Sequence, residues 1–143
     1  MAILTGDLTW KYVEAVNNLS GDVTITAADI GAYGADNINE ALVPIVDVSG
    51  IAYTTILSDR GSLLVCSNAS PVGCTIPPES EVAYPIGTVI SFMQQGAGQV
   101  SLIAGSGVNL LSENGLNINA QDGLATAIKI ASDTWSVSGS MAA

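Results

Sequence analysis

The sequence predicts a mainly β domain with a sandwich- or barrel-like arrangement, preceded by a short and partly helical N-terminal arm. From about residue 53, short apolar or alternating runs are separated by Gly, Asn, Asp and Pro, a spacing typical of all-β domains. The region before it instead carries helix-start signals. Because 143 residues suffice for one core with an appendage, we expect an arm over residues 1–48 and a β-domain over residues 49–143.

The expected strands follow from runs that alternate or are apolar throughout. These runs are YTTIL, SLLVC, GCTI, GTVISFMQ, GQVSLIA, VNLLS, LATAIKIA and TWSVSG. In LATAIKIA, Lys129 points to one face of the strand, because successive side chains alternate. The residues expected on the other face are Leu124, Thr126, Ile128 and Ile130. ASDTW then supplies a turn into a strand with Trp135 and Val137 on one face, which predicts a C-terminal hairpin.

The arm contains signals for short helices. Apolar residues recur at near-helical spacing and predict a helix from about Thr9 to Asn18. Capping-box patterns start at Thr26 and Asn37, and the helices that follow them would end at Gly31 and near Pro44. Helices of one or two turns do not form stably alone, because nucleation is costly. We therefore expect these segments to need a surface on which to dock.

The composition predicts an assembly component. Charged residues make up 11% of the chain and hydrophobic residues 48%, whereas roughly 25% of an ordinary globular chain is charged. A chain of this size has too little interior for so much apolar area, so we expect it to cover part of that area with copies of itself or with a partner.

Charge and hydropathy exclude two kinds of partner. The net charge is −10, and the three basic residues, Lys11, Arg60 and Lys129, are scattered along the chain. Nucleic acid is therefore not an expected partner, because phosphate binding requires clustered Lys and Arg. No apolar run approaches the roughly 18 residues that span a bilayer, and no basic region precedes an apolar run at the N-terminus. We expect neither membrane insertion nor a secretory signal.

The residue types needed for most catalysis are missing. The chain contains no His, which removes the commonest general base and zinc ligand. Glu79 and Glu81 form the closest acidic pair, but their Pro-bounded loop offers no basic or aromatic setting, so we expect solvated loop charges. The glycine-rich pieces QQGAGQ and AGSGVN lack the Lys of a phosphate loop and predict turns. We expect no enzyme, no cofactor and no metal.

The two cysteines, Cys66 and Cys74, flank the segment SNASPVG. This spacing suits a hairpin in which the two thiols face each other across paired strands. Two readings stay open: a pair of buried free thiols, as is usual in a reducing cytoplasm, or a disulfide.

Several of these segments together resemble a known family. The stretch from YPIGTVISFMQQGAGQ to TWSVSG resembles a β-domain of bacteriophage virion proteins, notably capsid decoration (cement or head-fibre) proteins and tail-fibre ends. The matching motifs are Pro85–Thr88, Gly96–Gly98, Gly105–Val108 and the hairpin Ala125–Trp135, and the resemblance covers roughly residues 53–139. VTITAADIGA also resembles a short linker module beside such domains, with the core Thr-x-x-Asp-Ile-Gly-Ala.

The resemblance implies a homotrimeric virion structural protein that is made in the host cytoplasm, binds the major capsid protein and lies on the capsid surface. It carries over no catalytic residue. The arm would then be an anchor, with apolar residues that contact the capsid or a neighbouring subunit; the alternative is that they cover the β-domain of their own chain. These residues are Leu8, Trp10, Tyr12, Ile30, Ile38 and Leu42.

The alternative function is a tail-fibre tip that binds a host receptor or surface glycan. Its stacking candidates would be Tyr53, Tyr84 and Trp135. Trp135 lies in an alternating strand, which favours a place in the core. Tail-fibre chains are usually long, with shaft sequence, and this chain passes directly from a short arm to one domain. We therefore favour decoration.

Overall fold

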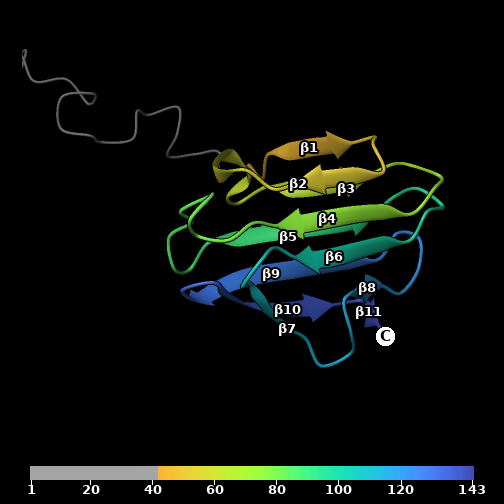
Figure 1. Cartoon of the computed structure of the whole chain (residues 1–143). Coiled ribbons are helices and arrows are strands. Elements are labelled where there is room, and N and C mark those ends of the chain that lie inside the picture. Colours follow the sequence, from red (N-terminus) through yellow and green to blue (C-terminus); the bar gives the residue numbers. More distant parts are fainter. Residues whose placement is uncertain (1–41) are drawn as a thin grey trace, which may run out of the picture. The chain divides into compact units, whose positions relative to one another are not determined.

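The structure is a computed structural model that describes residues 42–143 (Figure 1). The chain divides into the units Met1–Leu42 and Val43–Ala143, and the second unit consists of two β-sheets and one short 3-10 helix, η1 (Leu57–Asp59). The six-stranded sheet has the order β1 (Ile45–Val48), β3 (Leu63–Cys66), β5 (Val89–Gln94), β9 (Leu124–Ala131), β10 (Thr134–Gly139) and β7 (Asn109–Leu111). The five-stranded sheet has the order β11 (Met141–Ala142), β8 (Asn117–Ile118), β6 (Val100–Ala104), β4 (Val72–Ile76) and β2 (Ala52–Thr54).

The first six strands wind as in a β-solenoid. Each coil places one strand in each sheet, so that β1, β3 and β5 pair in parallel in one sheet and β2, β4 and β6 do so in the other. The two sheets lie face to face (Figure 1). Beyond β6 the parallel winding stops, because β9 pairs antiparallel with β5 and β8 antiparallel with β6. The short strands β7 and β11 then lie at the edges of the two sheets.

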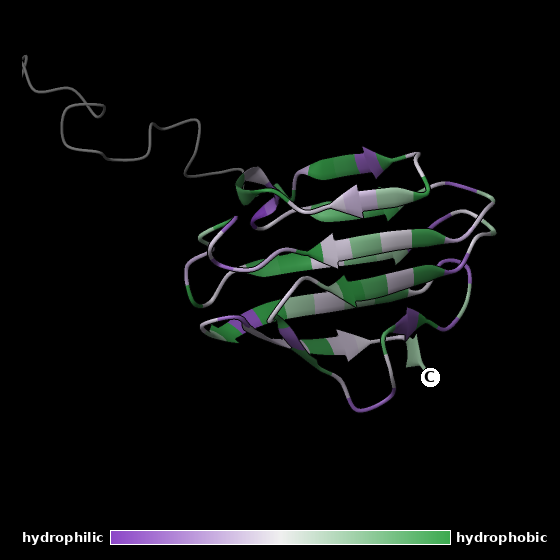
Figure 2. Cartoon of the chain, viewed as in Figure 1, coloured by the Kyte–Doolittle hydropathy of each residue, from purple (hydrophilic) through white to green (hydrophobic). Residues whose placement is uncertain are grey.

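Alternating side chains fill the space between the sheets. Every second residue of β3 and of β4 is buried, as the period of a strand requires. The large core side chains include Leu64, Ile76, Ile90, Phe92 and Trp135. The rings of Tyr84 and Trp135 meet edge to face with centroids 5.3 Å apart, a favourable aromatic geometry. The strands in Figure 2 accordingly alternate between apolar and paler segments.

Strand β9 has the predicted alternation, but the core lies on the side of Lys129. Lys129 is 2% exposed and points inward with Ala125 and Ala127. The opposite face, with the larger aliphatic residues, is solvent-exposed: Leu124 is 44% and Ile128 38% exposed. The ammonium group of the inward-pointing Lys129 is bonded to two oxygen acceptors of the loop between β4 and β5.

The turns between coils stack on one another at one end of the solenoid. Gly98 donates its backbone N–H to the carbonyl of Asn68 over 3.1 Å. Asn68 in turn donates its side-chain amide to the carbonyl of Ser49 over 2.7 Å. Gly96 and Gly98 lie so close to the Ser67–Ser70 backbone that any side chain at either position would collide with a carbonyl group. QQGAGQ is therefore a turn, as its composition predicted, and glycine is needed there for close approach.

The mainly β class and the C-terminal hairpin are confirmed. The sandwich- or barrel-like connectivity is not confirmed, since the strands are β-solenoid-like. Pairing of β1 with β3 starts at Ile45, upstream of the expected boundary at residue 49. The helices predicted from Thr9 and Thr26 lie outside the described residues, as does most of the one from Asn37; residues 42–44 at its end are not helical. No helix within residues 42–143 has the length and apolar character to cross a membrane.

Candidate functional site

The outward side of the six-stranded sheet is the candidate site, because large apolar side chains that are exposed or half-buried gather there. We call it the apolar face and define it by Val65, Val89, Met93, Leu111, Leu124 and Ile128. The strand register places them in two rows across the sheet. Val65 pairs with Met93 and Met93 with Leu124 in one row. In the other, Val89 pairs with Ile128, and Ser136 of β10 connects Ile128 to Leu111.

Two of the polar groups between these rows are bonded to each other. Ser91 pairs with Thr126, and their hydroxyl groups are hydrogen-bonded at 3.1 Å. Two hydroxyl groups that are bonded to each other lose fewer hydrogen bonds when water leaves the surface than two unpaired hydroxyl groups would. The apolar face can therefore be covered by another protein surface at little polar cost.

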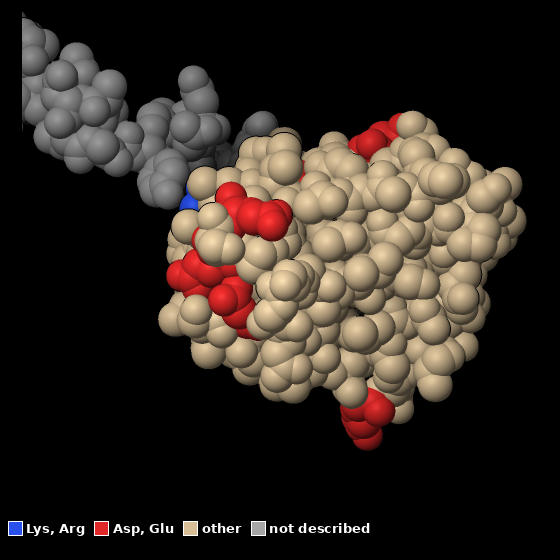
Figure 3. Space-filling model, viewed as in Figure 1, with Lys and Arg blue, Asp and Glu red and all other residues tan. Residues whose placement is uncertain are grey.

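Among residues 42–143, two charged residues lie on strands of the six-stranded sheet, and one of them, Lys129 in β9, points into the core. Asp47 lies on the edge strand β1, where Ser67 Oγ donates to its Oδ1 over 3.1 Å. The other acidic residues within residues 42–143 occupy loops and η1. Figure 3 shows the opposite side of the molecule, that of the five-stranded sheet, and there too the acidic side chains lie at the margins.

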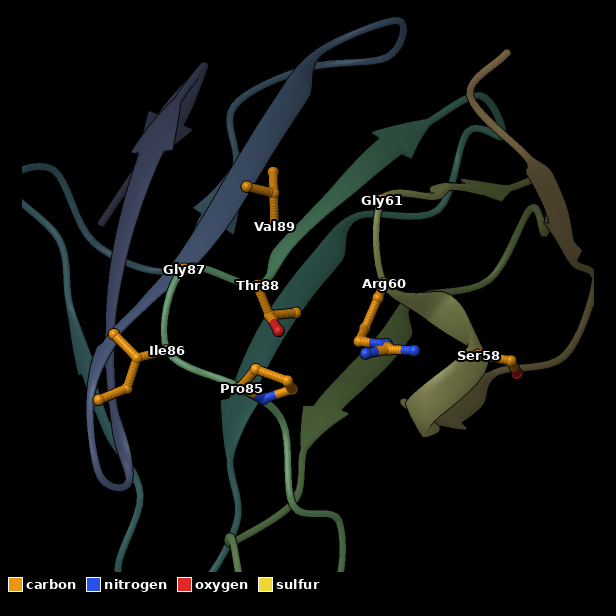
Figure 4. A pocket seen from close by; sticks show the side chains of 8 residues that line it. All are labelled: Ser58, Arg60, Gly61, Pro85, Ile86, Gly87, Thr88 and Val89. Atoms are coloured by element: carbon orange, nitrogen blue, oxygen red, sulfur yellow. The ribbon is translucent and has the colours of Figure 1, made fainter. Parts of the chain in front are cut away.

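An open hollow borders the apolar face at the start of β5. It is lined by Ser58, Arg60, Gly61 and residues 85–89 (Figure 4). In Figure 4 the side chains of Arg60 and Thr88 converge near Pro85, while Ile86 and Val89 point away. Arg60 Nε donates to the carbonyl of Leu57 over 3.1 Å, which fixes the side chain over the hollow. Its planar guanidinium suits a carboxylate of another molecule.

The buried acid Asp59 has a structural role. Its carboxylate accepts hydrogen bonds from Tyr53 Oη at 3.1 Å and from the backbone N–H of Ile56 at 2.8 Å. Burial and then the negative charge of Asp59 raise the pKa of Tyr53 to about 12, so the phenol keeps its proton. These bonds fix the corner between β2 and β3.

The two cysteines face each other across the core and not across a hairpin, because Cys66 lies in β3 of one sheet and Cys74 in β4 of the other. Both are free and buried, with Sγ atoms 3.7 Å apart. The hydrogen bond with Cys66, together with burial, raises the pKa of the Cys74 thiol. A protonated, enclosed thiol is a poor nucleophile.

The structure places only part of the sequence-predicted site. Leu42 is described and is 75% exposed. The other five predicted anchor residues, Leu8, Trp10, Tyr12, Ile30 and Ile38, lie outside the described residues. Within residues 42–143, no cluster of three or more His, Cys, Asp and Glu side chains could hold a metal ion.

The surroundings of Glu79 and the exposure of the three aromatic residues differ from what the sequence predicted. Glu79 does have a basic neighbour, since Lys129 Nζ lies 3.0 Å from its Oε2. The proposed stacking residues are not free: Tyr84 is 3% and Trp135 1% exposed, and Tyr53 is half-buried with its hydroxyl bound to Asp59. Sequence reasoning missed the apolar face, although the large residues of LATAIKIA were the available signal.

Comparison with known protein families, curated proteins and solved structures finds no match to the chain.

Proposed function

We propose that the chain is a phage virion structural protein, a capsid decoration protein that binds the major capsid lattice as a homotrimer. The observation that carries this proposal is the apolar face. A sheet that turns Leu124 and Ile128 to solvent and Lys129 to the core has a surface suited to another protein. The family resemblance of the stretch from Pro85 to Trp135 supports the virion setting.

The fold suits a structural surface protein. From β1 to β6, parallel coils with stacked turns place hydrogen bonds along both sheets. Each coil supports its neighbours, as in other stacked architectures. We assign no catalytic role to the chain. Its cysteines are buried, and the carboxylate of Asp59 already accepts hydrogen bonds from Tyr53 and Ile56.

The receptor-binding alternative has less support. It relied on aromatic side chains available for stacking on a glycan, and two of the three candidates, Tyr84 and Trp135, are core residues. Decoration needs no exposed aromatic side chain in the β-domain. We therefore favour decoration over a tail-fibre tip.

The test is co-sedimentation of the full chain with phage heads that lack this protein. We expect the full chain to pellet with the heads. Trp10→Ala and Leu42→Ala should bind more weakly than Asp36→Ala, because the anchor would act through buried apolar area. A full chain that stays in the supernatant would exclude decoration. Equal binding by all three variants would show that the residues that bind the capsid are not the apolar residues of the arm.

A further inference from the structure

We infer that copies of this chain associate with one another through the apolar face. The number of copies, three, rests on the proposed function; the choice of surface does not. The occupant of the face is a second copy of the same chain. Three observations support this choice: the two sheets differ in the size of their outward side chains, strand β9 turns its larger aliphatic residues outward, and few charged groups lie on the face.

The outward sides of the two sheets differ in the size of their side chains. On the five-stranded sheet, outward positions are small or polar, as in the register row Ala52, Gly73 and Ser101. Ile103 is the large aliphatic residue there, 45% exposed, and it lies over Gly73. On the six-stranded sheet, two of the outward rows carry Val, Met, Leu and Ile side chains, with Asp47 and Ser136 as their other members. The row between them includes Ser91 and Thr126. Apolar association therefore favours the six-stranded sheet.

Strand β9 shows that this preference is built into the chain. Its inward positions are Ala125, Ala127 and Lys129, and its outward ones include Leu124 and Ile128. In an isolated domain the larger aliphatic residues would contribute more if buried, by about 25 cal/mol per Å² of apolar surface. The arrangement is favourable when the outward face is covered in an assembly.

The distribution of charge allows the apolar faces of two copies to come into contact. The net charge of −10 makes copies repel one another, so they can approach closely only where acidic groups are few. The apolar face has Asp47 on one margin, at edge strand β1, and Arg60 at another, in the hollow beside Val89. One acid and one base on the margins of the same face provide complementary charges when copies meet.

The dimensions are those of an interaction patch, about half the area per partner of a standard-size interface. Six strands spaced about 4.8 Å apart and roughly 17 Å long give a face on the order of 400 Å², even when treated as flat. Uncovered apolar patches of a few hundred Å² on a soluble chain mark interaction sites.

The experiment compares two substitutions that add the same charge to opposite sheets of the full-length chain. Ile128→Glu places a carboxylate within the apolar face, and Ile103→Glu is the matched control, since both side chains are similarly exposed, at 38% and 45%. Light scattering after gel filtration should give an oligomer for the wild type and for Ile103→Glu. For Ile128→Glu the mass should fall toward the 14.5 kDa of one chain. Circular dichroism checks that each variant is folded, and Leu124→Asn, a milder change on the same face, should also lower the mass.

Two results would overturn the inference: a monomeric wild type, or an oligomer that Ile128→Glu and Leu124→Asn leave intact. The same proteins are then sedimented with heads. A monomer that binds heads through the apolar face would overturn the inference while leaving decoration standing. An oligomer that Ile128→Glu dissociates but that never binds heads would support the inference and exclude decoration.

Discussion

Lys129 of β9 binds the loop between β4 and β5, which is far from it in the sequence. From its buried position, Nζ donates to Glu79 Oε2 over 3.0 Å and to the carbonyl of Tyr84 over 2.7 Å. Ser132 Oγ donates to the same Glu79 oxygen over 2.8 Å. The loop between β4 and β5 is thereby attached to the β9–β10 turn. Because a buried ammonium group needs a nearby anion, Glu79 stabilises the folded state beyond what an exposed ion pair would.

We expect Glu79 to contribute a pH-dependent part of the stability. The hydrogen bond from Ser132 and then the bond and charge of Lys129 hold the pKa of Glu79 below its ordinary value. A lowered folded-state pKa adds stability above the unfolded-state pKa, and this stability is lost as pH falls through the folded-state value. In denaturant unfolding, Glu79→Gln should therefore be less stable than the wild type at pH 7, and the difference should shrink toward pH 3.

Glu81→Gln, a substitution two positions along the same loop, is the control. It should change stability little at either pH, because Glu81 makes no side-chain hydrogen bond or ion pair within residues 42–143. A stability difference for Glu79→Gln that stayed constant from pH 7 to pH 3 would show that its carboxylate charge is not the stabilising group.

Alternation along the sequence predicted which residues of β9 share a face but not which face is buried. The direction is decided by partners far away in the sequence: Glu79 and Tyr84 supply the acceptors that make a buried lysine tolerable. The predicted core position of Trp135 is correct. Trp135 and Val137 alternate with polar residues in β10, and the apolar side of such a strand faces the core.

At the scale of elements, the stacking of turns holds successive coils together. Gly98 sits against the backbone of the preceding coil, where a methyl group would collide with the Ser70 carbonyl. We expect Gly98→Ala to lower the free energy of unfolding by about 1–3 kcal/mol, the usual effect of overpacking. Gly50→Ala is the control, because an added methyl group there would have the Ala52 carbonyl oxygen at 3.5 Å, an ordinary contact. Equal effects of the two substitutions in chemical denaturation would contradict close stacking.

The positions of most strands could be predicted, and their pairing could not. Alternation and turn residues located β3 to β6, β9 and β10, because the pattern is local. Parallel pairing joins residues such as Leu64 and Phe92, which are separated by a complete coil. Nothing in a single strand specifies that partner, so Cys66 and Cys74 were expected in a hairpin and instead lie on opposite sheets. The β9–β10 hairpin was predictable because its contacts are local.

At the scale of the whole molecule, composition predicted that apolar area would be covered by a partner, and the structure supplies a surface for it. With 11% charged residues, the chain has too few charged side chains to cover its surface. Large aliphatic side chains gather on the outward side of one sheet, whereas the outward side of the other, apart from Ile103, has small or polar ones. Sequence alone could not locate this face, because its two rows are assembled from strands that pair across the sheet.

Decoration of a phage capsid by a trimer can be tested by image reconstruction of heads incubated with the full chain and of heads without it. We expect additional density on the outer capsid surface, with threefold symmetry and with the six-stranded sheets of neighbouring copies turned toward one another. Identical reconstructions with and without the chain, at concentrations that saturate binding of comparable proteins, would contradict it.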